Sequence, residues 1–169
     1  QAFGEPDPFG LVGESPAIWD LRVALTALAR RDVHVLVLGP SGSGKERVVH
    51  AIHAQSARRE RPLIARNAAT IPEGLVDAEL FGHAKNFPNP GTPERPGLVG
   101  EASGGTLFLD ELAELPSHLQ AHLLRVLDSG EYHRLGESRS RQADLRLSGV
   151  SGATSRKVSR SLIHGSLGR

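Results

Sequence analysis

A glycine-rich stretch between an apolar strand and a helix constrains this chain more than any other feature. The segment "VHVLVLG" is rich in branched residues and ends abruptly at Gly39 and Pro40, which predicts a buried strand. From Lys45 to about Ala57, apolar residues recur at helical spacing. The sequence "GPSGSGKE", residues 39–46, lies between the two. It therefore predicts a tight loop that leads from a strand into a helix.

This loop has the composition of a phosphate-binding turn. Its glycines, Gly39, Gly42 and Gly44, let the backbone curl with its N–H groups inward, and the helix that follows adds its positive end. Lys45 would neutralise the terminal phosphates. Such loops usually continue with Ser or Thr, whose hydroxyl helps to hold magnesium, whereas Glu46 stands here. The residues alone leave two interpretations: a nucleotide site that holds its metal in another way, or a glycine-rich turn with a chance lysine.

A second pattern of the same kind of site lies further along the chain. The stretch "TLFLDE" reads as an apolar strand that ends in two acids, Asp110 and Glu111. A magnesium-dependent nucleotide site needs such an acid, and we expect its strand to lie beside the first one. Asp110 would hold the metal, and Glu111 would orient the attacking water. An acid pair can also be an ordinary solvated strand end, so it is the combination with the glycine loop that favours nucleotide binding.

The remaining segments alternate between predicted helices and strands. Apolar residues recur at three- and four-residue steps from Pro16 to about Arg31, which predicts a helix, and "PLIARN" predicts a second strand. "PSHLQAHLLRVLDSG" predicts a helix capped by Ser117, and a last strand is expected from Asp144 to Val150. This alternation favours an α/β fold, with a parallel sheet between two layers of helices.

Composition excludes several other classes of protein. With 20 Lys+Arg against 19 Asp+Glu, there is no overall electrostatic case for binding nucleic acid or an anionic membrane. The absence of cysteine excludes disulfides, thiolate metal sites and cysteine nucleophiles. No apolar run approaches the ~20 residues that span a bilayer and no signal-peptide pattern opens the chain, which predicts a cytoplasmic protein. The chain begins at Gln1 and has no Met, so we expect a piece of a longer protein.

Several blocks of the sequence, taken in order, resemble the central AAA+ ATPase domain of bacterial sigma-54-dependent transcription activators. The resemblance covers about residues 11–147 and rests on "LVGESPAI", "GPSGSGKE", "NAATIPEGLVDAELFGHAK", "GGTLFLDELAELPSHLQAHLLRVLDSGEYHRLGE" and "DLRL". In that family the loop normally ends GKE, so Glu46 is the expected residue there. The resemblance implies a P-loop NTPase fold of AAA+ type.

The resemblance also implies a role for each matching residue. Val12 and Gly13 match the backbone stretch that lies against the adenine. Asp110 matches the metal-binding acid and Glu111 the water-activating acid. Asn67 matches an asparagine that pairs with the catalytic glutamate, although without the resemblance it reads as a turn residue after a strand. The phosphate loop and the residue after it correspond to Gly39, Pro40, Ser41, Gly42, Ser43, Gly44, Lys45, Glu46 and Arg47.

The same resemblance implies cofactors, partners and a domain plan. The cofactors are ATP and Mg²⁺, and hydrolysis would drive a ring-shaped homo-oligomer that remodels the RNA polymerase complex with sigma-54. DNA would be contacted only through a module outside this chain, and no membrane is involved. We divide the chain into a lead-in segment (1–10), the AAA+ α/β core (11–150) and a basic, Ser-rich C-terminal segment (151–169). The C-terminal segment could meet phosphates or form a solvated face.

Two departures from the family pattern limit what can be carried over. The family's sigma-contacting loop, GAFTGA, is replaced by "NFPNPG" in a proline-rich loop expected over residues 83–97, which speaks against the sigma-54 contact. Phe87 could supply an apolar contact instead, or pack on its own loop. "GATSR" matches the family's phosphate-sensing strand end only with an insertion, and Arg169 could stand where a trans-acting arginine belongs. We expect the 169 residues to stop before the family's helical lid. An alternative function is therefore a nucleotide-responsive interaction module with little turnover and no sigma-54 contact.

Histidine pairs give a weaker signal. His118 and His122 have a metal-compatible spacing on a helix, but no third ligand accompanies them. His50 and His53 are expected to be partly exposed residues of the helix after the glycine loop.

Overall fold

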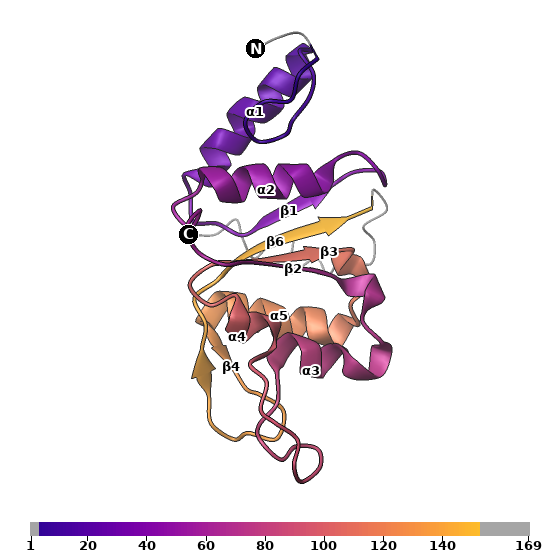
Figure 1. Ribbon diagram of the computed structural model, residues 1–169, viewed down its shortest axis with the longest axis vertical. Helices are drawn as coiled ribbons and strands as arrows, with labels where there is room; N and C mark the ends of the chain where they lie inside the picture. The colour runs from indigo at the N-terminus through magenta and orange to yellow at the C-terminus, as the bar shows by residue number, and fades with distance from the viewer. Residues whose placement is uncertain (1–3, 153–169) are drawn as a thin grey trace.

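The protein is described by a computed structural model that covers residues 4–152, and its centre is a parallel sheet (Figure 1). The four strands of this sheet follow the order β1-β6-β3-β2 and all run parallel. They are β1 (Val35–Leu38), β2 (Leu63–Asn67), β3 (Thr106–Asp110) and β6 (Arg146–Ser151). Two further short strands, β4 (Glu131–Tyr132) and β5 (Arg141–Gln142), form an antiparallel pair.

Helices cover both faces of the sheet, which confirms the predicted three-layer fold. In Figure 1, α1 (Pro16–Ala29) and α2 (Lys45–Gln55) lie on one side of the sheet. The other side carries α3 (Val76–Phe81), α4 (Gly97–Glu101) and α5 (Ser117–Ser129). Three short 3-10 turns, η1 (Ala68–Thr70), η2 (Glu73–Leu75) and η3 (Leu112–Glu114), follow the ends of β2 and β3. None of the described helices is long and apolar enough to cross a bilayer.

Apolar packing fixes the sheet from both sides. The two central strands, β3 and β6, are almost entirely buried. On the α5 side, Leu107 and Leu109 of β3 join Leu123 of α5 in the larger apolar cluster, and all three are 0% exposed. On the other side a smaller cluster contains Leu11 and Ile52. The smaller cluster ties the segment before α1 to the helix that follows the glycine loop.

The expected order of the strands was wrong in one respect. We expected the strand that ends at Asp110 to lie beside the strand that precedes the glycine loop. In the structure β6 lies between them, with Val37 paired to Val150 on one side and Leu107 paired to Leu147 on the other. The strand is apolar enough to be central, because all six of its residues are buried. Its place could not be read from hydropathy, which says that a strand is buried but not which strands flank it.

Two local expectations were also wrong. Ser117 does not cap α5: it is the first residue of the helix, Pro116 occupies the cap position, and no side-chain cap bond forms. His53 is buried rather than partly exposed, because its Nδ1 lies 3.0 Å from the Thr106 hydroxyl at the start of β3. His50 is exposed, as expected. His122 stacks on Phe81 with 4.0 Å between ring centroids, so its ring packs α5 against α3.

The proline-rich loop predicted over residues 83–97 is irregular as far as residue 96, whereas Gly97 begins α4, and the loop closes on itself. His83 and Arg95 exchange two backbone hydrogen bonds of 3.0 Å, and the Ala84 N–H donates to the carbonyl of Leu135, between β4 and β5. Phe87 packs on Gly136 so closely that a Cβ at that glycine would overlap the ring. The loop and the β4–β5 connection therefore form one joined projection, seen at the lower end of the molecule in Figure 1.

Candidate functional site

The glycine loop and the acid pair lie at the same edge of the sheet. Because the strands are parallel, their carboxyl ends share one edge, and the register pairs Leu38 with Ser151 and Asn67 with Asp110. The N–H of Gly39 donates to the Ser151 carbonyl at 3.4 Å, which joins the start of the loop to the end of β6. One strand separates β1 from β3, so their tips are about 10 Å apart at ordinary strand spacing. That distance suits a polyphosphate held at one tip and a metal held at the other.

The glycine loop is shaped by left-handed backbone and folds around Lys45. Gly42 and Gly44 have φ values of 76° and 81°, a region that side chains disfavour, and Gly44 is the residue from which α2 begins. The Lys45 ammonium donates to the Pro40 carbonyl at 2.7 Å, and the residue is only 8% exposed. The N–H of Ser43 also donates to Pro40. The loop therefore holds a buried cation at the positive end of a helix, which is an arrangement that binds anions.

The two acids differ in conformation and in hydrogen bonding. Asp110 ends β3, and its carboxylate accepts the N–H of Glu111 at 2.9 Å and the side-chain amide of Asn67 at 3.2 Å. Glu111 adopts a left-handed backbone, with φ 50° and ψ 45°, which is uncommon for a residue with a side chain. Strained backbone of this kind, of order 1–3 kcal/mol, often marks a functional site. Asp110 is thus a fixed carboxylate, and Glu111 turns away from the strand direction.

The hydrogen bond of Asn67 differs from what the resemblance implied. Its amide donates to Asp110, whereas pairing with Glu111 was expected. The parallel register explains this, because Asn67 lies directly opposite Asp110 in the sheet. The side-chain oxygen Oδ1 of Asn67 also accepts the N–H of Ala69 at 2.9 Å, which starts the turn η1. Asn67 is therefore the turn residue that its position suggests, and it also donates a hydrogen bond to the Asp110 carboxylate.

The segment before α1 approaches the glycine loop from the side of α2. Arg47 in the first turn of α2 donates to the Gly10 carbonyl at 2.7 Å. Val12 is 49% exposed, and Gly13 has a φ of 122° with Ile18 close to the position of a Cβ. The structure therefore brings Val12, Gly13 and Arg47 to the side of the loop that carries α2. Glu46 points into solvent: its side chain is 73% exposed and lies 3.8 Å from His50.

Magnesium chemistry fits the donor set at the strand edge. Mg²⁺ in nucleotide sites is held by one or two carboxylates together with phosphate oxygens and water. Within residues 4–152, no group of three or more His, Asp or Glu side chains could hold a metal ion by itself. Asp110 has acceptor capacity beyond its two hydrogen bonds. One fixed carboxylate is the protein ligand expected for a Mg²⁺ ion whose other ligands are phosphate oxygens and water.

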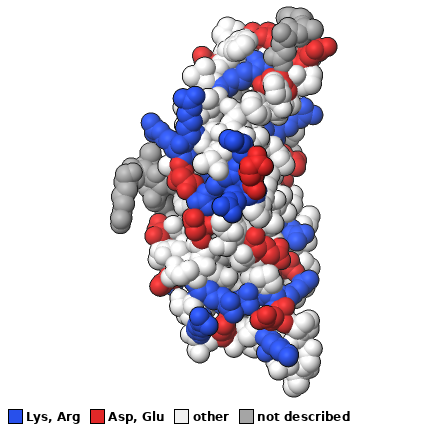
Figure 2. Space-filling view, turned by 60° about the vertical axis from the view of Figure 1, so that its left-hand side comes forward, with Lys and Arg blue, Asp and Glu red and all other residues white. Residues whose placement is uncertain are grey.

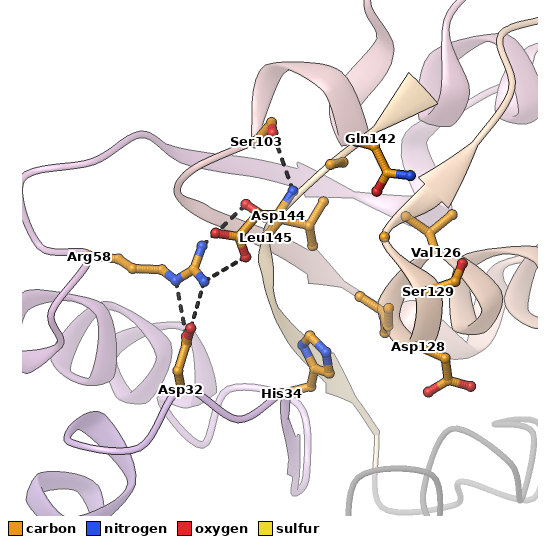
Figure 3. A pocket seen from close by; sticks show the side chains of 13 residues that line it. Asp32, His34, Arg58, Ser103, Val126, Asp128, Ser129, Gln142, Asp144 and Leu145 are labelled. Atoms are coloured by element: carbon orange, nitrogen blue, oxygen red, sulfur yellow. Dashed lines mark hydrogen bonds and ion pairs between the residues drawn. The ribbon is translucent and has the colours of Figure 1, made fainter. Parts of the chain in front are cut away.

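A cavity of about 570 Å³ lies at the opposite edge of the sheet, at the amino ends of β1 and β6 (Figure 3). Arg58 crosses one wall, donating to Asp32 at 2.6 and 3.0 Å and to the Asp144 carboxylate at 2.8 Å. These bonds raise the pKa of Arg58, and the same contact lowers the pKa of Asp32. None of the predicted site residues lines this cavity. No sequence pattern predicted this cavity, because its walls come from segments as far apart along the chain as Asp32 and Leu145.

Surface charge indicates no second site on the described part of the face that Figure 2 shows. Figure 2 shows blue and red side chains interspersed over the face that it presents, with no broad field of one sign. The composition is equally balanced. "GATSR", Arg169 and most of the basic C-terminal segment lie outside the residues that the structure describes.

The strand order, the glycine loop after β1 and the acids after β3 define a P-loop NTPase domain of AAA+ type. Solved structures agree. NtrX from Brucella abortus superposes with a TM-score of 0.76 at 38% identity, covering 84% of this chain and 31% of that chain. The P-loop NTPase domain of an E. coli sigma-54 transport activator matches with a TM-score of 0.55 at 21% identity over 83% of this chain and 80% of its own length, which supports the fold alone.

A family model described as "Sigma-54 interaction domain" matches residues 11–168. The chain therefore belongs to the sigma-54 interaction domain family. Similar curated proteins include the nitric oxide reductase transcription regulator NorR2 of Cupriavidus necator, 47% identical over 88% of this chain and 28% of the relative. NtrC of Klebsiella pneumoniae is 42% identical over 81% of this chain and 29% of the relative. The chain spans less than a third of the length of these relatives.

Proposed function

We propose that this domain binds Mg·ATP at the carboxyl edge of its sheet and hydrolyses the γ-phosphate, as the ATPase core of a sigma-54-type transcriptional regulator. The shared edge of the glycine loop and the acid pair supports this function. Two solved structures of the similar NtrX contain ADP and ATP, at 37% and 33% identity to this chain. From the shared edge of the sheet and from these two similar structures, we infer that this chain binds a nucleotide.

In this proposal each part of the site has a separate task. The amides of residues 39–46 and the positive end of α2 hold the phosphates, and Lys45 exchanges its bond to the Pro40 carbonyl for a bond to a phosphate oxygen. Asp110 holds Mg²⁺, which would neutralise charge on the phosphates. Glu111 accepts a hydrogen bond from the attacking water and orients it toward the γ-phosphate. Asn67 keeps the Asp110 carboxylate in place.

The observation that carries the proposal is the fixed orientation of Asp110 beside a strained Glu111. A solvated strand end needs neither feature. Here Asp110 is bound from both sides, by a side-chain amide of the next strand and by the Glu111 N–H. At Glu111 the left-handed backbone then turns the chain away from the line of β3. A pre-arranged carboxylate pair is what water activation beside a metal requires.

The test is a steady-state ATPase assay over a range of protein concentrations. Glu111→Gln keeps the shape of the side chain and removes the charge, so the rate should fall by about 100-fold or more while Mg·ATP still binds, because general-base positioning contributes on that order. Lys45→Ala should weaken binding itself. The matched control is Glu73→Gln, which changes an exposed glutamate on η2. An unchanged rate in Glu111→Gln would remove the assigned role.

The wider role of the domain also belongs to this proposal. We infer a homo-oligomeric, ring-forming ATPase in the cytoplasm that acts on a transcription complex and reaches DNA through another module. If neighbouring subunits complete each site, the rate per subunit must rise steeply with concentration. A rate per subunit that stays constant across a hundredfold dilution would count against a shared site.

A second candidate function is favoured by the joined projection of residues 83–97 and the β4–β5 connection. Its Phe87 is packed on Gly136 instead of being presented to a partner, and Arg134 pairs with Glu94 at 3.3 Å across the two segments. This geometry favours a module that makes no sigma-54 contact through this loop; such a module would bind nucleotide, change its assembly and turn over little. Sedimentation with ADP, with ATP and without nucleotide separates the two functions: assembly that depends on nucleotide, with negligible hydrolysis at every concentration, favours the second.

A further inference from the structure

The segment before α1 is folded into a tight, internally bonded loop around Asp7. The Asp7 carboxylate is 7% exposed, and one of its oxygens accepts the N–H groups of Phe9 and Leu11, each at 2.9 Å. The Asp7 N–H donates to the Leu11 carbonyl at 2.9 Å, and the Gly10 N–H donates to the Asp7 carbonyl at 2.9 Å. Leu11 itself is buried in the cluster under α1 and α2. The backbone that leads to Val12 therefore has one defined path.

Arg22 of α1 binds this loop with three different parts of its guanidinium. Its Nε donates to the second oxygen of Asp7 at 2.9 Å. One terminal nitrogen donates to the Gly13 carbonyl at 3.0 Å, and the other donates to the Leu11 carbonyl at 3.2 Å. The Arg22 side chain is 13% exposed and lies 4.9 Å from the centre of the Trp19 ring. A largely covered arginine thus holds the backbone on both sides of Val12.

The hydrogen bonds of Arg22 and Asp7 occupy the backbone groups on either side of Val12 but not those of Val12 itself. The carbonyls of Leu11 and Gly13 and the N–H of Leu11 are all occupied. Within the described part of the chain, the N–H and C=O of Val12 and the N–H of Gly13 have no hydrogen-bond partner. A 6-aminopurine presents one acceptor, N1, beside one donor, the 6-amino group. An adjacent backbone donor and acceptor is complementary to that edge, whereas a 6-oxopurine presents the opposite pair.

We propose that Arg22 and Asp7 are positioning residues that set base recognition, by holding the Val12 backbone so that it pairs with the adenine edge. This inference rests on the proposed nucleotide site. Arg47 extends the arrangement, because its bond to the Gly10 carbonyl joins the same loop to the first turn of α2, directly after the phosphate loop. The base end and the phosphate end of the nucleotide are thereby fixed relative to each other through one short segment. Arg22 and Asp7 act through Val12 and need not touch the ligand.

The test compares ligands with and without the base. Dissociation constants of Mg·ATP, Mg·ITP and Mg·tripolyphosphate are measured by calorimetry for the 169-residue chain and for Arg22→Ala and Asp7→Asn. Asp7→Asn keeps the shape of the side chain and replaces an acceptor of Arg22, so it serves as the milder variant. Arg30→Ala, an exposed arginine just beyond α1, is the matched control. Circular dichroism melting shows that each variant is folded.

The proposal predicts a loss of affinity only for ligands that contain the adenine base. Arg22→Ala should weaken Mg·ATP by about tenfold, the equivalent of one or two net hydrogen bonds, and lower the preference for ATP over ITP. Mg·tripolyphosphate should bind within about twofold of the parent chain, as should every ligand to Arg30→Ala. Arg22→Lys, which restores one bond, should recover part of the preference.

The possible failures are distinguishable. If the parent chain binds neither Mg·ATP nor Mg·tripolyphosphate, the proposed function fails and this inference fails with it. If the parent chain prefers ATP and both variants keep that preference, Arg22 and Asp7 do not position the base and only this inference fails. If both folded variants bound ATP and tripolyphosphate with equally weakened affinity, the contacts of Arg22 and Asp7 would be merely structural. That result would also overturn this inference.

Discussion

Arg58 joins three elements at the edge of the sheet away from the glycine loop, and replacing it offers a quantitative test of the fold. Its side chain is 12% exposed and follows α2. It donates to Asp32 before β1 and to Asp144 before β6 (Figure 3). It also donates to the backbone carbonyls of Gly105 and Asp144, both at 3.2 Å. No other side chain in the described part of the chain is bonded to all of these segments.

The expected loss in Arg58→Ala can be worked from these contacts. The two carboxylates are 62% and 81% exposed, so solvent screens them and each ion pair contributes only about 0.5 kcal/mol. The two backbone carbonyls contribute about 1 kcal/mol each, the usual net value of a hydrogen bond. The free energy of unfolding should therefore fall by about 3 kcal/mol. For a domain of this size that lowers Tm by about 6–12 °C.

The assay is thermal and urea unfolding followed by circular dichroism, with Arg59→Ala as the control. Arg59 is the next residue, is 62% exposed and meets only Glu60 at 3.5 Å, so its loss should change Tm by less than about 2 °C. Mg·ATP affinity should be unchanged in both variants, because the contacts lie at the opposite edge of the sheet. Equal melting of Arg58→Ala and Arg59→Ala would refute the assignment.

The pH dependence of this loss has a defined sign. Contact with Arg58 lowers the pKa of Asp32 below its ordinary value of 3.8. A carboxylate with a lowered pKa in the folded state stabilises the fold above its unfolded pKa, and this contribution disappears as pH falls through the folded value. The difference between Arg58→Ala and the parent chain should therefore be constant near neutrality and shrink below about pH 4. A difference that grew on acidification would contradict the ion-pair explanation.

Three further predictions follow from other contacts. Gly136→Ala should destabilise the chain by about 1–3 kcal/mol in urea unfolding, because a Cβ there overlaps Phe87; Gly91→Ala, with a similar positive φ and open space around it, isolates the backbone part of that loss. Burial lowers the pKa of His34, whose Nδ1 accepts the Leu147 N–H at 3.1 Å, so the free energy of unfolding should fall as pH drops below about 6.5. The fall should be smaller in His34→Gln, and urea midpoints at several pH values would measure the difference. Asn67→Ala should slow ATP hydrolysis by about tenfold with little effect on Mg·ATP binding, since it frees one side of Asp110, and single-turnover kinetics would reveal an unchanged chemical step if this is wrong.

The sequence predicted the elements of the fold well because their hydrophobic patterns are local. The strand before Gly39, the helix from Lys45 and the apolar strand that ends at Asp110 each carry their own signal. The burial of His53 was missed, although helical spacing could have indicated it, since His53 lies four residues after the buried Val49 on the same face of α2. The two-residue strands β4 and β5 are too short to produce a pattern.

Pairings between distant segments could not be read in the same way. The position of β6 between β1 and β3, the Arg58 contacts and the bonds of Arg22 each join residues whose neighbourhood is created only by the fold. The resemblance to a family supplied the residues of the site but not their partners. For Asn67 it implied a bond to Glu111, whereas the structure shows a bond to Asp110.

The register of the sheet explains why Asp110, rather than Glu111, receives the amide of Asn67. Asn67 and Asp110 are the last residues of two paired strands and lie directly opposite each other. Glu111 has already left the strand, because its backbone turns into the left-handed region. Its N–H then returns to the Asp110 carboxylate, so the residue that would orient water and the residue that would hold the metal share one hydrogen bond. A change at Asn67 therefore reaches Glu111 only through Asp110, so the slower hydrolysis expected for Asn67→Ala would be transmitted through this shared hydrogen bond.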